Sequence, residues 1–374
     1  MADIEEYLIW RGDLTFKQDA FNDVDNALLS AMAYVDMHGI VPESDSKGSV
    51  TLADASRLFF EEHSRKELQA DESFIREMPF LMQKMAESRR FSEIKLSKYM
   101  EIIDEEAQMQ FAAFHIDLGD GSTYIAFKGT DDTLVGWKED FNMSFISPVP
   151  SQHTAVEYVN NTVKSGEGKL RLGGHSKGGN LAIYAAVHCD GRVRRRILEV
   201  YNNDGPGFDR SVVESKEYRE MLPKIKTIVP YHSVVGMLLE HEESYMVVES
   251  SQTGILQHDI MSWQVLGREF VKKDSISKAS GVLNKALSNW INSLDNLRRE
   301  EFVEALFDII KASGATTLSD IRTDRFNSAG AAFKLYKTMD KDTRVMLMRI
   351  LHSLTGEFDK VIRAEKGKKT QHIV

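Results

Sequence analysis

The sequence predicts an α/β fold in which a mostly parallel sheet is covered by helices on both faces. Two observations support this prediction. Short apolar strand-like segments alternate with segments of helical periodicity through the middle of the chain, and a glycine-rich turn joins one such strand directly to a helix. From about residue 279 onward the strand-like segments disappear. We therefore expect a core with N-terminal helices over 1–278 and a helical C-terminal extension over 279–374, packed on the core.

The sequence predicts three helices within the first hundred residues. Apolar residues recur at three- and four-residue spacing over 22–37, 52–62 and 74–87, which predicts helices with one buried face. Thr51 and Ser73 precede the second and third of these segments and are expected to cap them.

The periodicity then changes to that of strands. Two apolar runs, 111–118 and 123–127, flank a Gly-Asp-Gly-Ser turn and predict a hairpin. A helix over 154–163 and a strand from residue 170 follow.

Further strands are expected over 197–201, 225–229 and 245–248, the first ending in the turn-rich loop 202–207. Helical segments over 286–312 and 344–362 complete the chain. The sequence alone does not distinguish a separate helical subdomain from a cap over the sheet.

Composition narrows the class of protein. The 374 residues are 42% hydrophobic and 28% charged, enough for a large core in a soluble protein. The net charge of −10 and the lack of a basic stripe argue against a nucleic-acid partner. The acidic N-terminus does not resemble a signal peptide, and no apolar run is long enough to cross a membrane. The single cysteine, Cys189, excludes an intramolecular disulfide and fits a reducing compartment, so we expect a cytoplasmic protein.

The most informative segment is Gly174–Gly178, which has the pattern G-x-S-x-G. A strand precedes it and a helix-like run follows, as a nucleophile elbow requires. Such a turn lifts the hydroxyl of Ser176 above the sheet edge, next to a helix N-terminus that favours a developing oxyanion. A phosphate-binding loop does not fit, because Lys177 precedes Gly178 and no Gly-Lys-Ser/Thr follows. The elbow predicts an α/β-hydrolase.

A serine nucleophile needs a histidine that accepts its proton. In α/β-hydrolases the chain order is serine, acid, histidine, so the base is sought downstream of Ser176. His258 lies in a loop just after the last predicted strand and is the leading candidate, with His232 as the runner-up. His241 lies in an acidic stretch and is expected at the surface.

The acid that orients this histidine is less clearly marked. Asp204 closes the strand that follows the elbow helix, on the edge where such sheets bind ligands. Glu240 and Asp259 remain alternatives, and Asp204 could instead cap the Gly-Pro-Gly turn.

An oxyanion hole needs two N–H donors. The residue after the nucleophile, Lys177, is expected to supply one. The second is expected from Thr130, in a turn after an earlier strand that Gly129 allows to adopt an unusual conformation.

These residues together resemble the class 3 lipase group of α/β-hydrolases. The segment 126–130, Ala-Phe-Lys-Gly-Thr, with Trp137 and Asp140 is similar to that group's A-F-R-G-T…W…D segment. The segment 174–178 is similar to its G-H-S-x-G elbow.

The bacterial Mbeg-like branch of that group, whose function is undefined, is the best match. The segments 22–30, 202–207 and 233–237, and the helix with Trp290, are similar to this branch, so the resemblance covers roughly residues 20–350. The chain departs from the lipase pattern at one place. Lipases of this class carry their acid after the strand that corresponds to 225–229, where this chain has Ser233. Either the acid has moved to Asp204 or the triad is incomplete.

The sequence therefore predicts a serine hydrolase of small or lipid acyl esters that uses Ser176, His258 and Asp204. No cofactor is expected, and no metal, because no histidine and carboxylate residues have ligand spacing. The alternative is a hydrolase-fold binding or scaffold protein with a vestigial site, which the serine at position 233 favours. Acyl length, leaving group and oligomeric state are not determined by the sequence.

Overall fold

The computed structural model describes residues 2–71, 73, 75–164, 168–312 and 317, together with scattered positions between 341 and 355. The helix predicted over 344–362 lies largely outside the described residues. Within the described part, no helix combines the length and apolarity that crossing a membrane requires.

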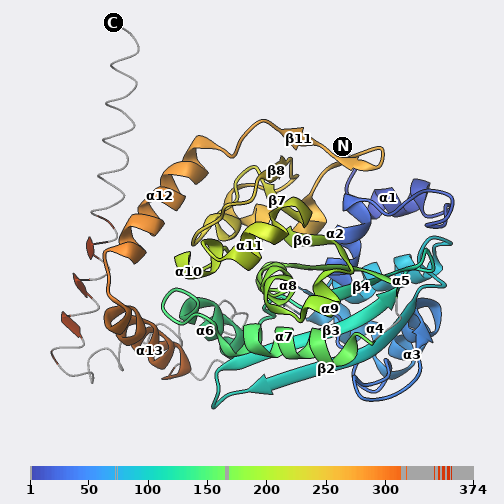
Figure 1. Ribbon diagram of the computed structural model, residues 1–374, viewed down its shortest axis with the longest axis horizontal. Coiled ribbons are helices and arrows are strands. Elements are labelled where there is room, and N and C mark those ends of the chain that lie inside the picture. Colours follow the sequence, from blue (N-terminus) through green and yellow to red (C-terminus); the bar gives the residue numbers. More distant parts are fainter. Residues whose placement is uncertain are drawn as a thin grey trace, which may run out of the picture.

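The centre of the described structure is a nine-stranded sheet with the order β1-β2-β3-β4-β5-β6-β7-β8-β11 (Figure 1). Its strands are β1 Val50–Thr51, β2 Lys95–Asp104, β3 Met109–Asp117, β4 Ser122–Phe127, β5 Lys169–His175, β6 Ile197–Asn203, β7 Ile225–Pro230, β8 Tyr245–Val248 and β11 Lys272–Lys273. The strands β4 to β8 pair in parallel, whereas β1 to β4 and the β8–β11 pair are antiparallel. The carboxyl ends of β4 to β8 therefore share one edge, where α/β folds place their ligand sites.

Helices cover both faces of this sheet, as the sequence predicts. They are α1 Ile4–Arg11, α2 Asp23–Met32, α3 Leu52–Glu62, α4 Arg65–Ala70, α5 Met78–Glu87, α6 Leu134–Asn142, α7 Pro150–Thr162, α8 Lys177–His188, α9 Gly191–Arg194, α10 Arg210–Val213, α11 Lys216–Met221, α12 Lys278–Asn292 and α13 Asn296–Ala312. Short 3-10 turns, η1 Leu222–Lys224, η2 Val235–Met237, η3 Gly254–His258 and η4 Ile260–Ser262, and a small hairpin, β9 Val265–Leu266 with β10 Glu269–Phe270, complete the described elements.

Strand β4 shows how the two faces are filled. Tyr124 and Ala126 belong to one core, together with residues of α1, α2, α3 and α5. The alternate residues Ile125 and Phe127 belong to a second core, together with residues of α7, α8 and α11. Because successive side chains of a strand point to opposite faces, a strand segment that is buried on both sides carries apolar residues at successive positions, as residues 124–127 do.

Local signals explain where several helices begin. The Thr51 hydroxyl accepts a hydrogen bond from Asp54 N–H and caps α3, as expected. Ser73 does not cap α5, since that helix begins later, at Met78, with Pro79 in its first turn. Proline suits this position because the first-turn N–H groups have no intrahelical acceptor.

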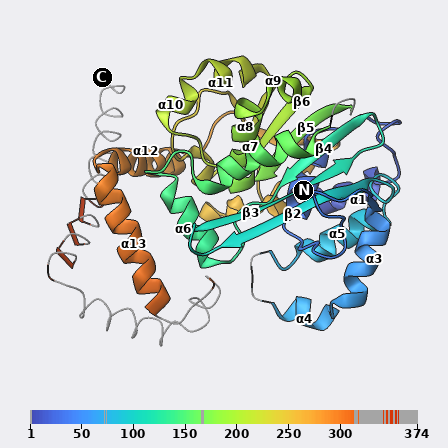
Figure 2. The same ribbon diagram turned by 60° about the horizontal axis from the view of Figure 1, so that its bottom comes forward.

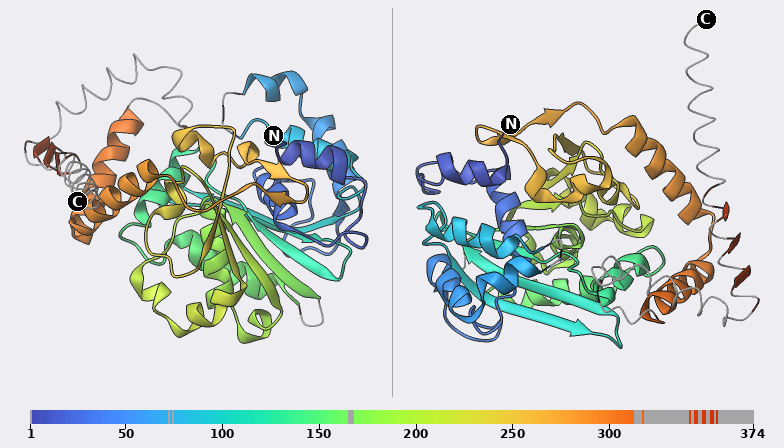
Figure 3. Two further views of the ribbon diagram at one scale, coloured as in Figure 1. Left: turned by 90° about the horizontal axis from the view of Figure 1, so that it is seen from above. Right: turned by 180° about the vertical axis from the view of Figure 1, so that it is seen from behind.

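The helical segment predicted over 286–312 is two helices rather than one. The carboxylate of Asp295 accepts a hydrogen bond from Arg298 N–H at 2.9 Å, which caps the start of α13 and separates it from α12. Residues Leu294, Phe302, Val303, Ala305 and Phe307 form a third, smaller core, against which Trp137 of α6 also packs. Figure 2 shows α13 beside α6, away from α3 and α4. In both views of Figure 3, α12 and α13 lie at the opposite end of the molecule from the N-terminal helices.

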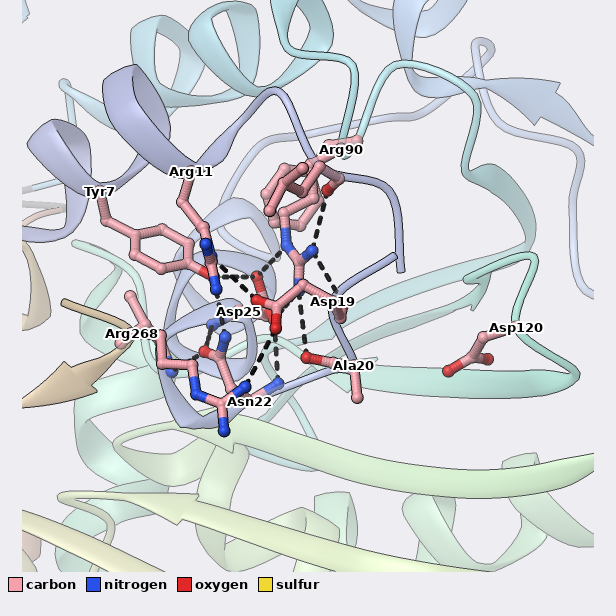
Figure 4. A network of polar contacts seen from close by, with 12 residues as sticks. Tyr7, Arg11, Asp19, Ala20, Asn22, Asp25, Arg90, Asp120 and Arg268 are labelled. Atoms are coloured by element: carbon pink, nitrogen blue, oxygen red, sulfur yellow. Dashed lines mark hydrogen bonds and ion pairs between the residues drawn. The ribbon is translucent and has the colours of Figure 1, made fainter. Parts of the chain in front are cut away.

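A buried ion pair holds the N-terminal helices together (Figure 4). Arg90 binds Asp25 of α2 through two hydrogen bonds of 2.7 and 2.6 Å, and both side chains are fully buried. The Tyr7 hydroxyl of α1 donates to the same carboxylate at 3.0 Å. Nearby, Asp19 pairs with both Arg11 and Arg268, the latter between β9 and β10. The network connects α1 and α2 to segments that are distant in the sequence.

Candidate active site

The glycine-rich turn has the strand–turn–helix context that the sequence predicts. Ser176 lies between the last residue of β5 and the first residue of α8, with φ 55° and ψ −131°. A non-glycine residue at positive φ costs free energy and persists only where the surrounding structure enforces it. A Cβ on Gly174 would lie 2.4 Å from the Gly178 backbone, and one on Gly178 would lie 2.2 Å from the carbonyl oxygen of Phe127. The turn therefore requires glycine at both positions. With this elbow at the edge of the parallel strands, the chain has an α/β-hydrolase fold.

The structure brings His258 and Asp204 together. His258 ends η3, and its Nδ1 lies 2.7 Å from Oδ2 of Asp204. The Asp204 carboxylate is fully buried, whereas the His258 side chain is 25% exposed. Ser176 and His258 line the same cavity. When the imidazole of His258 is neutral and its Nδ1–H group donates to the carboxylate, Nε2 carries no proton and can accept one.

Ser233 lies beside the Asp204 carboxylate and contacts it. Its hydroxyl donates to Oδ1 of Asp204 at 2.6 Å, and the Gly236 N–H donates to the same oxygen at 3.2 Å. Asp204 follows β6 and Ser233 follows β7, the neighbouring parallel strand. The carboxylate is thus presented one strand away from the position that the class 3 lipase pattern indicates. A Cβ on Gly236 would lie 2.2 Å from Oδ1, so only glycine leaves room for this carboxylate.

The other candidates from the sequence lie elsewhere or make other contacts. His232 pairs with the hydroxyl of Ser277 at 2.7 Å. Glu240 is exposed. The carboxylate of Asp259 lines the cavity but accepts a hydrogen bond from Met261 N–H.

The expectation for His241 is wrong. Its side chain is only 11% exposed, and Nδ1 lies 3.0 Å from the buried carboxylate of Glu243. The local acidic sequence suggested solvent exposure, but one of its glutamates points inward.

Both expected oxyanion donors lie at the cavity. Lys177 is the first residue of α8, where backbone N–H groups have no intrahelical acceptor. Thr130 follows β4, and its hydroxyl donates to Oδ2 of Asp140 at 2.6 Å. Burial raises the pKa of Asp140 to about 6, against the lowering influences of Lys177 and Thr130.

One part of the site was not expected from the sequence. The imidazole of His175 joins the N-terminal region to the loop that carries His258. Its Nε2 lies 2.7 Å from the His258 carbonyl oxygen, and its Nδ1 lies 2.9 Å from the Tyr34 hydroxyl. Because the carbonyl can only accept, Nε2 carries the proton and Nδ1 accepts from Tyr34. The pKa of His175 is lowered well below its usual value, mainly by burial and to a lesser extent by the nearby His258. This ring is therefore neutral. One of its hydrogen bonds depends on Tyr34, a residue distant in the chain.

The cavity above Ser176 is large and mainly apolar. Its volume is about 880 Å³. The C-terminal helices contribute Leu287, Trp290, Ile291, Leu294, Arg299, Phe302 and Val303 to its wall, and the loops after β7 and β8 contribute Val234, Val235, Leu238, Leu239, Ile255 and Leu256. The C-terminal helices are therefore placed as a wall over the site. Among the described residues, no group of three or more histidine, cysteine or acidic side chains is arranged to hold a metal ion.

Comparisons with known proteins give the following matches. Rhizomucor miehei lipase in its propeptide complex matches with a TM-score of 0.34 and 15% identity, over 47% of this chain and 70% of that lipase. The M37 lipase matches with a TM-score of 0.36 and 13% identity, over 59% of this chain and 71% of that one. A fungal lipase in an inhibitor complex matches with a TM-score of 0.32 and 12% identity, over 55% and 83%. Among curated proteins, none matches this sequence.

One comparison is with models of protein families. The model of one family matches residues 85–308, more than half of the chain, and this range includes the elbow, the His258–Asp204 pair and both expected oxyanion donors. The chain belongs to the Mbeg1-like family.

Proposed function

We propose that the protein is a serine hydrolase of carboxylic esters with apolar acyl groups. One observation carries the proposal: the buried Asp204 carboxylate holds the imidazole of His258 at 2.7 Å, in the cavity that Ser176 also lines from a strained turn. Perturbed or strained groups that converge in a cavity mark functional sites. The lipase-like fold is compatible with this chemistry but does not identify the substrate.

The proposed reaction has two halves. The Ser176 oxygen attacks the ester carbonyl carbon while Nε2 of His258 takes the hydroxyl proton, and Asp204 stabilises the imidazolium that forms. The negative carbonyl oxygen is held by the backbone N–H groups of Thr130 and Lys177. The tetrahedral intermediate collapses, and His258 returns its proton to the departing alcohol. Water then repeats the sequence on the acyl-serine and releases the acid.

The residues that line the cavity favour a substrate with an apolar acyl group. The volume of about 880 Å³ and the aliphatic and aromatic side chains of α12 and α13 suit a hydrocarbon chain. We propose residues 1–278 as the catalytic core and 279–374 as an extension whose first helices cover its site. The buried thiol of Cys189, whose pKa burial raises to about 11, is compatible with the reducing interior of the cell.

A fluorophosphonate probe tests the proposal, because it reacts with an activated serine and spares an inert one. We expect the wild type to be labelled and to hydrolyse p-nitrophenyl esters of graded chain length. Ser176→Ala should abolish both activities while leaving the circular dichroism spectrum unchanged.

Ser56→Ala, which changes a buried serine of α3 outside the cavity, is the matched control and should behave as wild type. If Ser176→Ala still hydrolyses esters, Ser176 is not the nucleophile. A wild type that is neither labelled nor active favours a binding or scaffold protein with a vestigial site.

A further inference from the structure

A buried ion pair lies next to the proposed nucleophile. The side chains of Lys177 and Glu139 are both fully buried, and Nζ of Lys177 lies 3.0 Å from Oε2 of Glu139. Taking two charges out of water is costly, and the cost is offset only where geometry and hydrogen bonding are good. A lysine directly after the nucleophile also has no role in the proposed chemistry beyond its backbone N–H. The pair therefore needs an explanation.

The surroundings fix both side chains. Besides Glu139, the ammonium of Lys177 donates to the carbonyl oxygen and the side-chain oxygen of Gln110, at 2.9 and 3.0 Å. The Glu139 carboxylate accepts from Ser151 N–H at 2.9 Å and from Gln110 N–H at 3.1 Å. The three N–H bonds of the ammonium thus have acceptors, and each carboxylate oxygen has a backbone donor. Such a fully connected network permits a single arrangement.

Glu139 is adjacent in α6 to the residue that holds the other proposed oxyanion donor. Asp140 accepts the Thr130 hydroxyl at 2.6 Å, while Glu139 binds Lys177. Two consecutive carboxylates of one helix therefore hold the two residues whose N–H groups would face the oxyanion. The preceding residue, Lys138, binds Glu304 of α13 at 2.7 Å, which connects α6 to the C-terminal wall of the cavity.

We propose that Glu139, through its buried ion pair with Lys177, is a positioning residue that fixes the elbow helix against α6 and so sets the distance between the two oxyanion donors. This inference rests on the proposed function. Oxyanion donors act only when they lie about 2.7–3.1 Å from the position of the charged oxygen, and loss of one donor costs about 10²–10³ in kcat. A displaced donor should cost less, about 10–100-fold, and the loss should appear in kcat rather than in KM, because the ester binds in the ground state without it.

The test uses Glu139→Met, Lys177→Met and the double variant Glu139→Met/Lys177→Met. The double variant removes both charges and keeps apolar volume, so it remains informative if a single variant with one unpaired buried charge does not fold. The measurements are kcat and KM per titrated active site, and the inhibition constant of a trifluoromethyl ketone, which forms a tetrahedral oxyanion on the serine. We expect kcat to fall by about 10–100-fold, KM to change little, and the inhibitor to bind more weakly in parallel with kcat. The effect of the double variant should be smaller than the product of the single effects, because the pair acts as one unit.

Asp25→Asn is the matched control. It breaks a second fully buried ion pair, with Arg90, that belongs to the N-terminal network. It should lower stability but leave kcat per titrated site unchanged. If the wild type hydrolyses esters and the Glu139 and Lys177 variants keep their kcat and inhibitor affinity, or if Asp25→Asn loses as much kcat, the positioning role is refuted and the proposed function stands. If the wild type neither hydrolyses esters nor reacts with the probe, the proposed function fails first, and the positioning role with it.

Discussion

Replacing Asp204 with asparagine is the sharpest single perturbation of the proposed mechanism. The substitution keeps the shape of the side chain and removes its charge. The backbone of Asp204 has φ 52°, a conformation that asparagine adopts as readily as aspartate, so the change adds no backbone strain. Any loss of activity then reflects the lost carboxylate.

The hydrogen bonds around the carboxylate decide how the asparagine would lie. Oδ1 accepts from the Ser233 hydroxyl and from the Gly236 N–H, and the latter cannot reverse its direction. The amide oxygen must therefore take the Oδ1 position, which turns the amide NH₂ group toward Nδ1 of His258. Facing a donor, the imidazole must carry its proton on Nε2, and in that tautomer it cannot accept the serine proton.

The magnitude follows from this geometry. An aspartate-to-asparagine change that traps the wrong tautomer lowers kcat by about 10⁴ in the serine-protease example of this mechanism. The donors around Asp204 force the same wrong tautomer on His258 in the asparagine variant, so we expect kcat to fall by about 10³–10⁴ here. Neither Ser233 nor Gly236 can substitute, because both are donors to the other oxygen.

The assay is hydrolysis of a p-nitrophenyl ester at pH 8, with the folded fraction established by circular dichroism. Glu240→Gln and Asp259→Asn are the matched controls, since neither carboxylate contacts the His258 ring in the described hydrogen bonds, and each should keep kcat within a few-fold of wild type. Near-full activity in Asp204→Asn, or an equal loss in the Asp259 variant, would refute the reasoning and move the acid elsewhere.

Three further outcomes are expected. Burial raises the pKa of Asp140 from its usual 3.8 to about 6. Between these two pH values the native state therefore binds more protons than the unfolded chain. The unfolding free energy of wild type should then fall, relative to that of Asp140→Asn, as the pH rises from about 4 to 6. Urea titrations at several pH values check this, and parallel curves for the two proteins contradict it. Asp25→Asn leaves the buried Arg90 without its counter-charge and should cost about 3–5 kcal/mol of unfolding free energy in the same assay, and a loss under 1 kcal/mol is inconsistent with this. Treatment with EDTA should leave the esterase rate unchanged, because the proposed steps use only side chains and backbone N–H groups; a loss that a divalent cation restores would point to a metal.

Much of the fold could be predicted from short stretches of sequence. The hairpin of β3 and β4, the elbow between β5 and α8, and the cap of α3 at Thr51 each depend on residues within a few positions of one another. The break between α12 and α13 was missed although Asp295 signals it, because apolar periodicity continues across it. The sequence also placed His258 and Asp204 in loops at the correct edge of the sheet, but left Glu240 and Asp259 as alternatives.

The sequence by itself thus determined the α/β class, the position of the glycine turn and the family resemblance, because these follow from local patterns of polarity and backbone preference. Only the tertiary structure decided that the Asp204 carboxylate faces His258, that Ser233 supports it from the next strand, and that Glu139 binds Lys177. These contacts depend on the register of parallel strands and on how α6 packs. The strand register and the packing of α6 are fixed by the free energy of burying the whole sheet. No short stretch of sequence around these residues determines that free energy.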